Sequence, residues 1–522
     1  MTGEKQSEKH HFIQQLNHKF EILSYYPVIS LIVIGLIGFL IRLYYFPYDV
    51  PLTLDAVGYF WYAIDMTVLG RFPEGYNFPN NGWPSFISLF FSLVKSENFL
   101  DYMNLQRYLS ISISVLTIIP VYLLCTRFVN KSYSLIGVAL FVLDPRIIQN
   151  SLAGITEPSY ILLGCVTILL FLSKRMVSVY SSFGTAALFS LVRYEGLFII
   201  IPISIMFFVR LRKEKMLLPK YFLAFTIFLL VLVPMAYIRI VTIGNDGLMY
   251  HAIESPSTYY SSSIMGNSGR PSFTDLITKS LYNFIQYAGW VMIPSYGFFV
   301  PLGALLFLKQ LDYKKTTIIL FAIIFILPAL YAYSRGFQDT RYLYVLYPIF
   351  SVLSLYTVEK INFKTKNPGI VWIALIVLIL SASLLFLDYK NINYEHERQA
   401  FRIAQHIAEI AKGINDYYPE AKFLSVSELK NHNFPILSTN ISKGPKLFST
   451  EGFTSLNDFI GANKKNGLTH IIVDDAENRP DFVKRLFLND DEYSFLVKEF
   501  DSSEYGYTYH VKVYKINYDK LN

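Results

Sequence analysis

Long apolar stretches, separated by short breaks rich in lysine and arginine, constrain this chain more than any other feature of its sequence. The stretches run to roughly 15–22 residues, enough for a helix to cross a bilayer core of about 30 Å at about 1.5 Å per residue. Short loops rich in Lys and Arg stay on the cytoplasmic side of a membrane. The pattern therefore predicts an α-helical, multi-pass membrane protein whose basic loops face the cytoplasm. The basic breaks are Arg127/Lys131, Lys174/Arg175, 210–220, Lys309/Lys314/Lys315 and Lys360/Lys364/Lys366.

Composition agrees with a membrane protein and argues against other classes. Hydrophobic residues make up 53% of the chain and charged residues 16%, and the mean hydropathy is +0.36, unlike a typical soluble domain. The net charge of +7 falls mostly in the predicted cytoplasmic loops, so it indicates topology and contact with anionic lipid rather than nucleic-acid binding. Cys125 and Cys165 lie inside apolar stretches, and we expect two buried thiols and no disulfide.

About eleven transmembrane helices are predicted, with segment 1–25 in the cytoplasm and the C-terminus outside. No cleavable signal pattern precedes the first stretch, which is therefore expected to be a retained signal anchor. A further apolar stretch, 82–94, is short, and counting it would turn the later basic loops outward, so we expect a helix that lies in the interface or re-enters it. The expected spans are 26–46, 107–126, 133–150, 157–173, 179–193, 195–210, 221–242, 287–308, 316–333, 342–358 and 368–387.

The spans define a transmembrane domain over 26–387, with a long first outer loop at 47–106, followed by a soluble outer domain at 388–522. The outer domain mixes helix and strand patterns, which predicts a small α/β or α+β fold. A helical apolar face covers 394–418, a buried strand 469–474, and a half-buried strand 505–513, and Asn440 begins a glycosylation sequon.

Ionisable residues cluster at the outer ends of the predicted spans, where charges are costly and often mark function. Asp55 follows the first span, with Tyr59 one helical turn later. Its carboxylate fits either a general base that takes a proton from an acceptor hydroxyl or the N-cap of a short helix. Glu157 begins the fourth span after Thr156, a potential cap, and the helix dipole alone can account for an acid there.

Two further clusters contain arginine. Arg193 and Glu195 share a short turn between two apolar stretches, either as a buried neutralising pair or as part of a site with Glu157. Arg341 begins the tenth span. Its guanidinium group fits bidentate phosphate binding or an interfacial side chain that reaches out to water. Acids and arginines at one depth on one face suit an anionic lipid head group.

Other polar residues are assigned structural roles. The Asp144-Pro145-Arg146 segment indicates a turn that ends a helix, and His251 in the long outer loop is expected to be a solvated loop residue. The sequence has no Gly-Lys-Ser/Thr phosphate loop, no Cys/His zinc spacing and no Gly-x-Ser-x-Gly elbow. Nucleotide hydrolysis is therefore not expected to supply energy, and an activated lipid-linked donor would need none.

The order of these motifs resembles the GT-C membrane glycosyltransferases, specifically the group of protein O-mannosyltransferases and aminoarabinose–lipid A transferases. The resemblance extends from the first span to about residue 350 and rests on DAVGYFWYAIDM, PNNGWP, LDPRIIQNSLAGITEPSYILL, FSLVRYEGLFIIIP and DTRYLYVLYPIF. It implies a GT-C fold with Asp55 as the first-loop catalytic acid and Glu157 as the second. Arg341 and Arg193 are the implied contacts of the donor phosphate. The same segments supply the expected substrate-binding residues Tyr59, Tyr194, Glu195, Asp339 and Tyr342.

The implied activity is inverting transfer of a monosaccharide on the outer face of a cytoplasmic membrane. The donor would be a polyprenyl- or dolichyl-phosphate sugar, and the acceptor a hydroxyl of a protein, glycan or lipid. Two departures are evident: mannosyltransferases often carry two acids where this chain has Asp55-Ala56, and the Trp-Trp-Asp-Tyr-Gly signature of oligosaccharyltransferases is absent. No metal ligand is predicted, although a divalent ion between Asp55 and Glu157 is left open. The alternatives are transfer of a preassembled oligosaccharide, a transporter or lipid flippase, and a non-catalytic relative.

Overall fold

The computed structural model divides into two compact units. The first comprises Met1–Phe46, Leu52–Val94 and Met103–Ile392, and the second comprises Pro47–Pro51, Lys95–Tyr102 and Asn393–Asn522. The structure describes residues 27–53, 55–73, 79–96, 98–254, 272–362, 368–390, 392–412, 448–450, 452–477 and 479–521.

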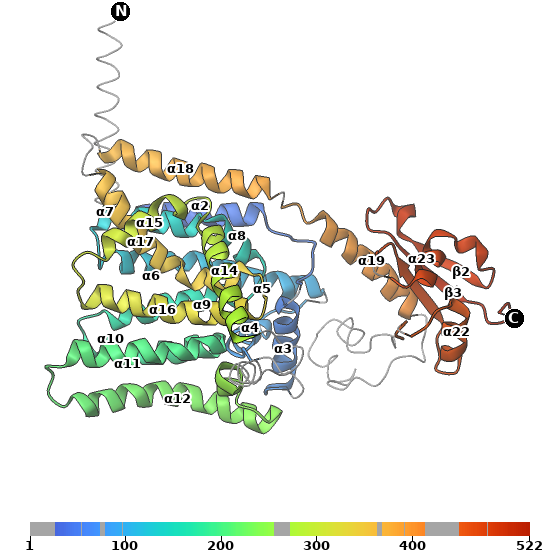
Figure 1. Cartoon of the computed structure of the whole chain (residues 1–522), viewed down its shortest axis with the longest axis horizontal. Helices are drawn as coiled ribbons and strands as arrows, with labels where there is room; N and C mark the ends of the chain where they lie inside the picture. Colours follow the sequence, from blue (N-terminus) through green and yellow to red (C-terminus); the bar gives the residue numbers. More distant parts are fainter. Residues whose placement is uncertain are drawn as a thin grey trace, which may run out of the picture. The chain divides into compact units, whose positions relative to one another are not determined.

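Helices make up the first unit, and many of them run side by side (Figure 1). They are α2 (Pro27–Tyr44), α3 (Asp55–Leu69), α4 (Gly82–Phe91), α5 (Phe99–Leu116), α6 (Ile118–Cys125), α7 (Lys131–Val142), α8 (Pro145–Leu152), α9 (Glu157–Phe171), α10 (Met176–Val192), η1 (Tyr194–Ile199), α11 (Ile200–Leu211), α12 (Leu217–Ile243), η2 (Tyr250–Glu254), α14 (Phe273–Met292), α15 (Tyr296–Phe307), α16 (Tyr313–Ser334), η3 (Thr340–Leu346), α17 (Tyr347–Asn362) and α18 (Pro368–Tyr389).

Length and composition mark the chain as a multi-pass membrane protein. Among the described residues, six helical stretches are long and apolar enough to cross a bilayer, and eight if each of two bent pairs counts as one span. Shorter apolar helices occupy α4, α9, α10 and Ala374–Tyr389. The total of eleven spans and their orientation stay predictions.

The spans at 133–150 and 287–308 were each predicted to be one helix. That prediction is wrong, because each falls in a pair of helices with a bend between them. Helices α7 and α8 meet at 51°, and α14 and α15 meet at 113°. The first bend lies at Asp144, whose carboxylate accepts a hydrogen bond from the backbone N–H of Arg146 at 2.9 Å and caps α8, so the turn predicted there is confirmed. Helix α14 begins at Phe273, well before the predicted boundary at residue 287, behind a capping box formed by Ser272 and Asp275. Hydropathy averaged along a stretch does not register a change of direction.

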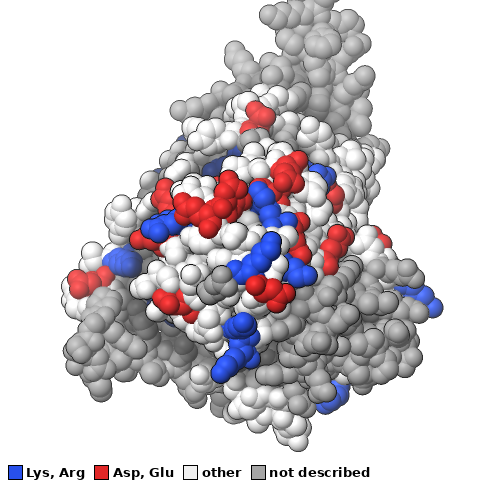
Figure 2. All heavy atoms as spheres, turned by 90° about the vertical axis from the view of Figure 1, so that its right-hand side faces the viewer, with Lys and Arg blue, Asp and Glu red and all other residues white. Residues whose placement is uncertain are grey.

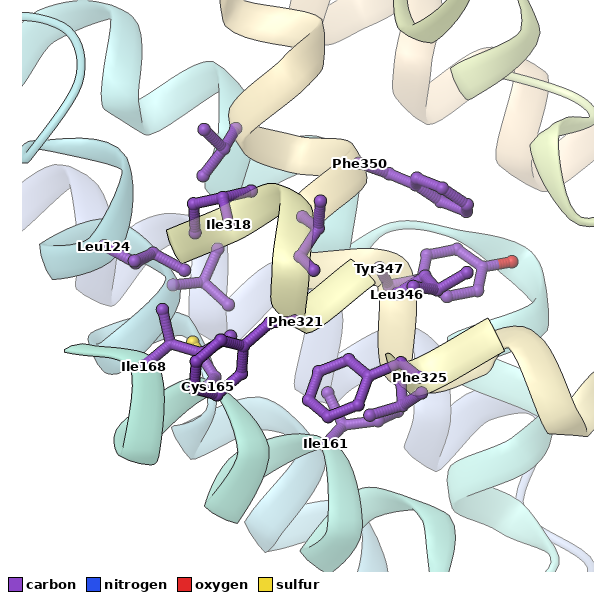
Figure 3. Close-up of a cluster of buried hydrophobic side chains, with 14 of the residues drawn as sticks. Leu124, Ile161, Cys165, Ile168, Ile318, Phe321, Phe325, Leu346, Tyr347 and Phe350 are labelled. Carbon is purple, nitrogen blue, oxygen red and sulfur yellow. The ribbon is translucent and has the colours of Figure 1, made fainter. Parts of the chain in front are cut away.

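A closely packed apolar core joins the helices of the first unit. Helices α6, α9, α16 and α17 and the turn η3 interdigitate there (Figure 3). Both cysteines are free and buried, as predicted, and Cys165 lies in this core. Because such packing tolerates little displacement, it fixes the ends of these helices relative to one another. The labelled core residues are Leu124, Ile161, Cys165, Ile168, Ile318, Phe321, Phe325, Leu346, Tyr347 and Phe350.

The second unit contains a three-stranded antiparallel sheet in the order β1-β3-β2. The strands are β1 (His470–Asp474), β2 (Leu496–Asp501) and β3 (Val511–Ile516), and the helical elements are α19 (Glu395–Lys412), α22 (Leu456–Lys464), α23 (Asp481–Leu488), η4 (Asp490–Glu492) and η5 (Ser502–Tyr505). Figure 2 shows acidic and basic side chains interspersed over the described part of the face turned to the viewer. No single-sign patch suited to nucleic acid is visible on that part.

The strand predicted over 505–513 is wrong for 505–510, because β3 begins only at Val511. Residues up to Tyr505 form the turn η5, which Asp501 caps by accepting a hydrogen bond from the backbone N–H of Ser503 at 3.0 Å. Gly506 follows with a φ of 71°, a conformation that breaks a strand. The prediction of a strand at 469–474 is confirmed by β1. Residues 413–418 of the predicted helix and the sequon at Asn440 lie outside the described residues.

Candidate active site

Four segments bring charged side chains together at one end of the first unit. Asp55 is the first residue of α3, and Glu157 is the first residue of α9. Arg193 lies between the end of α10 and the start of η1, and Arg341 lies in the first turn of η3. Because α9 and η3 begin at the end of the bundle where α10 stops, residues far apart in the sequence become neighbours.

These side chains form an alternating series of acids and arginines, called here the ionic chain. Nη1 of Arg341 lies 3.3 Å from Oδ2 of Asp55 and 4.0 Å from Oε1 of Glu157. Nη1 of Arg193 donates to the same oxygen of Glu157 at 2.6 Å. Nη2 of Arg193 donates to Oε1 of Glu195 at 2.9 Å. The order is therefore Asp55, Arg341, Glu157, Arg193, Glu195.

The ionic chain is buried from Glu195 to Glu157 and more exposed at Arg341 and Asp55. The exposed fraction of the side chain is 4% for Glu157 and 9% for Glu195, but 33% for Arg341 and 59% for Asp55. Charges removed from water are tolerated only when they are paired, and both buried acids contact Arg193. Asp55 is the acid of the ionic chain that solvent reaches most freely.

Asp339 fixes the position of Arg341. Its Oδ2 accepts a hydrogen bond from Nε of Arg341 at 2.6 Å, and its Oδ1 accepts one from the backbone N–H of Arg341 at 2.8 Å. The hydroxyl of Tyr333 donates to the backbone carbonyl of Asp339 at 3.0 Å, and its ring meets that of Tyr342 edge-on. The guanidinium group is therefore held from one side, and Nη1 remains directed at Asp55 and Glu157.

The structure distinguishes between the readings that the sequence left open. Asp55 is the first residue of α3, and its carboxylate contacts Arg341. Thr156 does not cap α9 through its side chain, so that prediction is wrong; its hydroxyl lies 3.4 Å from Oε2 of Glu157. The dipole of α9 alone does not account for Glu157, because Arg193 and Arg341 both approach its carboxylate.

Tyr59 and Tyr194 are tied to the site through Asn80. The amide nitrogen of Asn80 donates to the hydroxyl of Tyr59 at 3.1 Å, and its amide oxygen accepts from the backbone N–H of Tyr194 at 3.2 Å. Burial raises the pKa of Tyr59 to about 12, so the phenol stays neutral at physiological pH. Asn80 thus links α3 to the turn that carries Arg193 and Glu195.

Sequence reasoning missed Asn80, Asn81 and Arg239. Arg239 is 2% exposed near the end of the apolar helix α12, where it hydrogen-bonds the amide oxygen of Asn81. Both asparagines precede α4, whose Trp83 donates to the backbone carbonyl of Gly154 at 3.1 Å. Arg239 could have been identified from the sequence, because it is a lone arginine inside a predicted span and a charge at that depth needs a polar partner.

A cavity of about 160 Å³ adjoins the ionic chain. Residues from segments 194–198, 251–252 and 327–342 supply its walls. His251 belongs to this wall, and Nε2 of its ring is buried without a hydrogen-bond partner among the described residues. Burial and the charge of Arg239 lower the pKa of His251, so the ring is neutral at pH 7. The prediction that His251 is a solvated loop residue is therefore wrong.

Solved structures share this architecture. ArnT from Cupriavidus metallidurans, bound to undecaprenyl phosphate, matches with a TM-score of 0.56 and 12% identity, over 95% of this chain and 98% of that chain. Oligosaccharyltransferase AglB from Archaeoglobus fulgidus, in complex with an inhibitory peptide and a dolichol-phosphate, matches with a TM-score of 0.52 and 14% identity, over 86% of this chain and 69% of that chain. Both are GT-C superfamily membrane glycosyltransferases. The chain has a GT-C fold.

No protein-family model matches the sequence, and no curated protein matches it. A structure of the Archaeoglobus fulgidus oligosaccharyltransferase with Zn and sulfate aligns with a TM-score of 0.49 and 16% identity, over 81% of this chain. The chain spans only 59% of that oligosaccharyltransferase. The likeness to ArnT, by contrast, covers 95% of this chain and 98% of that chain.

The acids of this GT-C fold do not fit a divalent ion held between Asp55 and Glu157. Nη1 of Arg341 lies between these carboxylates, 3.3 Å from one and 4.0 Å from the other. Among the described residues, no group of three or more His, Cys, Asp or Glu side chains has the geometry to hold a metal ion. The positive charge that faces both acids is a guanidinium group.

Proposed function

We propose that this chain is a membrane glycosyltransferase that moves one monosaccharide from a polyprenyl- or dolichyl-phosphate donor to a hydroxyl of a protein, glycan or lipid. One observation carries the proposal: a widely exposed carboxylate, Asp55, contacts an arginine that also faces a buried acid, within a GT-C fold. Support for the donor class comes from two proteins of this fold, which bind undecaprenyl phosphate and dolichol-phosphate.

The orientation belongs to the same proposal. About eleven spans over 26–387, with the N-terminus in the cytoplasm, would keep every short basic loop inside. The ionic chain and the soluble domain at 388–522 would then lie on the outer face of the cytoplasmic membrane. An enzyme on the outer face has no access to cytoplasmic nucleotide sugars. It needs a sugar donor that is present on that face, and a lipid-linked donor meets this requirement.

Asp55 acts as the general base in the proposed reaction. Its carboxylate takes the proton of the acceptor hydroxyl, and the acceptor oxygen forms a bond to the anomeric carbon. The bond between that carbon and the phosphate oxygen breaks on the opposite side, so the configuration inverts. The lipid phosphate leaves with both bonding electrons, and Arg341 and Arg193 stabilise its charge.

The remaining site residues position these groups. Glu157 contacts both arginines, and its low exposure leaves it poorly placed to receive a proton from an acceptor. Glu195 and Asp339 hold Arg193 and Arg341 from the other side. The tyrosines Tyr59, Tyr194 and Tyr342 are proposed to line the substrate-binding site.

Transfer of a preassembled oligosaccharide is the second candidate, favoured by the likeness to the Archaeoglobus fulgidus oligosaccharyltransferase. The two candidates differ in the mass that reaches the acceptor, which is one sugar in the first and a whole glycan in the second. A transporter would instead move solute into vesicles that lack any donor lipid.

The test uses membranes from cells lacking the gene as the source of donor and acceptor, supplemented with purified full-length protein. Wild-type protein should deplete the pool of lipid-phosphate sugar, measured by mass spectrometry. Asp55→Asn should lower this rate about 10²-fold or more, the usual contribution of a general base, without lowering the thermal unfolding midpoint. Asp388→Asn, at an exposed acid near the end of α18, is the matched control and should behave as wild type. Turnover by Asp55→Asn within a few-fold of wild type would remove Asp55 as the base.

A further inference from the structure

The cavity beside the ionic chain has an unusual combination of walls. Tyr194, Tyr331 and Tyr342 contribute aromatic rings, and Phe198 and Phe337 add two more. Polar groups enter from separate elements: Glu195 from η1, His251 from η2, and Arg335 from the residue after α16. The cavity thus offers flat apolar faces together with a few converging hydrogen-bonding groups, the usual makeup of a small-molecule site.

The cavity shares wall residues with the space beside the ionic chain. Glu195 and Tyr342 line both this cavity and a much smaller space of about 10 Å³ that Glu157, Arg193 and Arg341 also line. A ligand in the larger cavity would therefore contact Glu195, the carboxylate that binds Arg193 at 2.9 Å. A group attached to that ligand would lie next to both arginines of the ionic chain.

One polar atom in the wall lacks a partner within the described structure. Nε2 of His251 is buried and unpaired among the described residues, although His251 packs against the rings of Tyr194 and Tyr250. A buried polar atom without a hydrogen bond costs free energy. Because Nε2 is shielded from solvent, the imidazole ring must turn toward the cavity to meet a ligand hydroxyl. Such a hydrogen bond would remove the cost, whereas a prenyl chain would not.

The volume limits what the cavity can hold. Sites for drug-sized molecules measure about 300–1,000 Å³, and this cavity measures about 160 Å³. The space suits a single six-membered ring and is too small for an oligosaccharide. A sugar ring also has apolar C–H faces that pack on aromatic rings and hydroxyls that bond to polar groups at its edge.

We propose that this cavity binds the sugar ring of the lipid-linked donor, with Tyr331 as a packing face and His251 as a hydrogen-bond partner of a ring hydroxyl. The proposal rests on the proposed function and adds to it a binding site for one sugar residue. The anomeric carbon then lies toward Glu195 and Tyr342, and the phosphate reaches the arginines of the ionic chain.

The test measures binding by the purified full-length protein in detergent micelles. The probes are farnesyl phosphate linked to mannose, glucose, galactose or N-acetylglucosamine, with unsubstituted farnesyl phosphate as the reference. Tyr331→Ala removes an aromatic face, and His251→Phe keeps a ring but removes the nitrogen. Each variant should weaken binding of the preferred sugar-linked probe about 5- to 10-fold, the effect of one lost hydrogen bond or packing contact. Affinity for farnesyl phosphate should change less than twofold.

Tyr282→Ala, at a 69% exposed tyrosine of α14, is the matched control and should bind all probes as wild type. Equal weakening for sugar-linked and unsubstituted probes would mean that the cavity holds the lipid or the phosphate, which would overturn the proposal. Unchanged affinity in both variants would overturn it as well. A wild-type protein that prefers no sugar-linked probe would contradict the proposed function itself, so the two failures are distinguishable.

Discussion

Asp55 and Glu157 carry the same charge at different depths of one ionic chain, and their surroundings suit them to different work. Glu157 is 4% exposed and lies 2.6 Å from Arg193, whereas Asp55 is 59% exposed and touches Arg341 at 3.3 Å. A carboxylate locked in a buried ion pair stabilises its arginine. A solvent-facing carboxylate can meet an incoming hydroxyl, which is why the proposal assigns the base to Asp55.

Removing Arg193 should destabilise the folded protein, because Glu157 and Glu195 would lose their nearest cation while remaining buried. Breaking a buried pair costs about 3–5 kcal/mol in soluble proteins, so Arg193→Ala should lower the thermal unfolding midpoint by about 5 °C or more. Arg212→Ala, at an exposed arginine beyond α11, should leave it unchanged. Equal midpoints for the two variants would show that the pair contributes little to folding.

The sequence predicts the membership of the ionic chain and offers Glu195 and Glu157 as partners of Arg193, and the structure contains both contacts. It does not predict that Arg341 contacts Asp55. Spans predicted to start and stop at the outer face place Asp55, Glu157, Arg193 and Arg341 at one depth, and the pattern of apolar stretches suffices for that prediction. The distances between side chains depend on how α9, α10 and η3 pack, which no local pattern encodes. The role of Arg239 was not predicted for a related reason: its partner Asn81 lies 158 residues away in the sequence.

At the scale of elements, the short helix α4 links the first loop to the site. Gly82 begins α4 against the backbone of α10: a Cβ there would lie 2.8 Å from the carbonyl carbon of Leu191 and 2.9 Å from the backbone N of Val192. Backbone atoms cannot turn aside as a flexible side chain can. The two residues before Gly82 are Asn80 and Asn81, so displacing α4 would also disturb the bonds to Tyr59 and Arg239.

Gly82→Ala should therefore lower both stability and sugar transfer. Forcing one extra carbon into a packed contact costs about 1–3 kcal/mol, and we expect a lower unfolding midpoint together with slower turnover. Gly289→Ala in α14 has nothing within 4 Å of the added carbon and should be neutral or slightly stabilising. If the two alanine variants behave alike, the close approach of α4 to α10 is not required.

Bends mark the limit of element prediction from this sequence. Apolar stretches at 133–150 and 287–308 were located correctly as hydrophobic, yet each contains a change of direction, at 51° and 113°. The first bend is indicated in the sequence by the turn at Asp144-Pro145, where Asp144 caps the following helix. The second bend follows α14, which begins inside a segment predicted to be a loop. This helix was missed because its exposed polar positions lower its average hydropathy.

At the scale of the whole molecule, one fold combines apolar helices, a charged site at their ends and a small mixed domain in a second unit. Sequence patterns anticipate this combination because a membrane-spanning helix and a half-buried strand differ plainly in length and periodicity. The distribution of lysine and arginine predicts the side of the membrane on which the site lies. What the site acts on depends on side chains from distant segments, and only their arrangement in space suggests a substrate.

The proposed reaction moves one sugar from a lipid phosphate to an acceptor outside the cytoplasm. Mass spectrometry of envelope lipids and proteins, from cells with and without the gene, tests it most directly. Loss of the gene should cause a polyprenyl- or dolichyl-phosphate monosaccharide to accumulate, and an envelope acceptor should become lighter by one sugar residue. Unchanged lipids and acceptors, or the loss of an entire oligosaccharide from the acceptor, would contradict it.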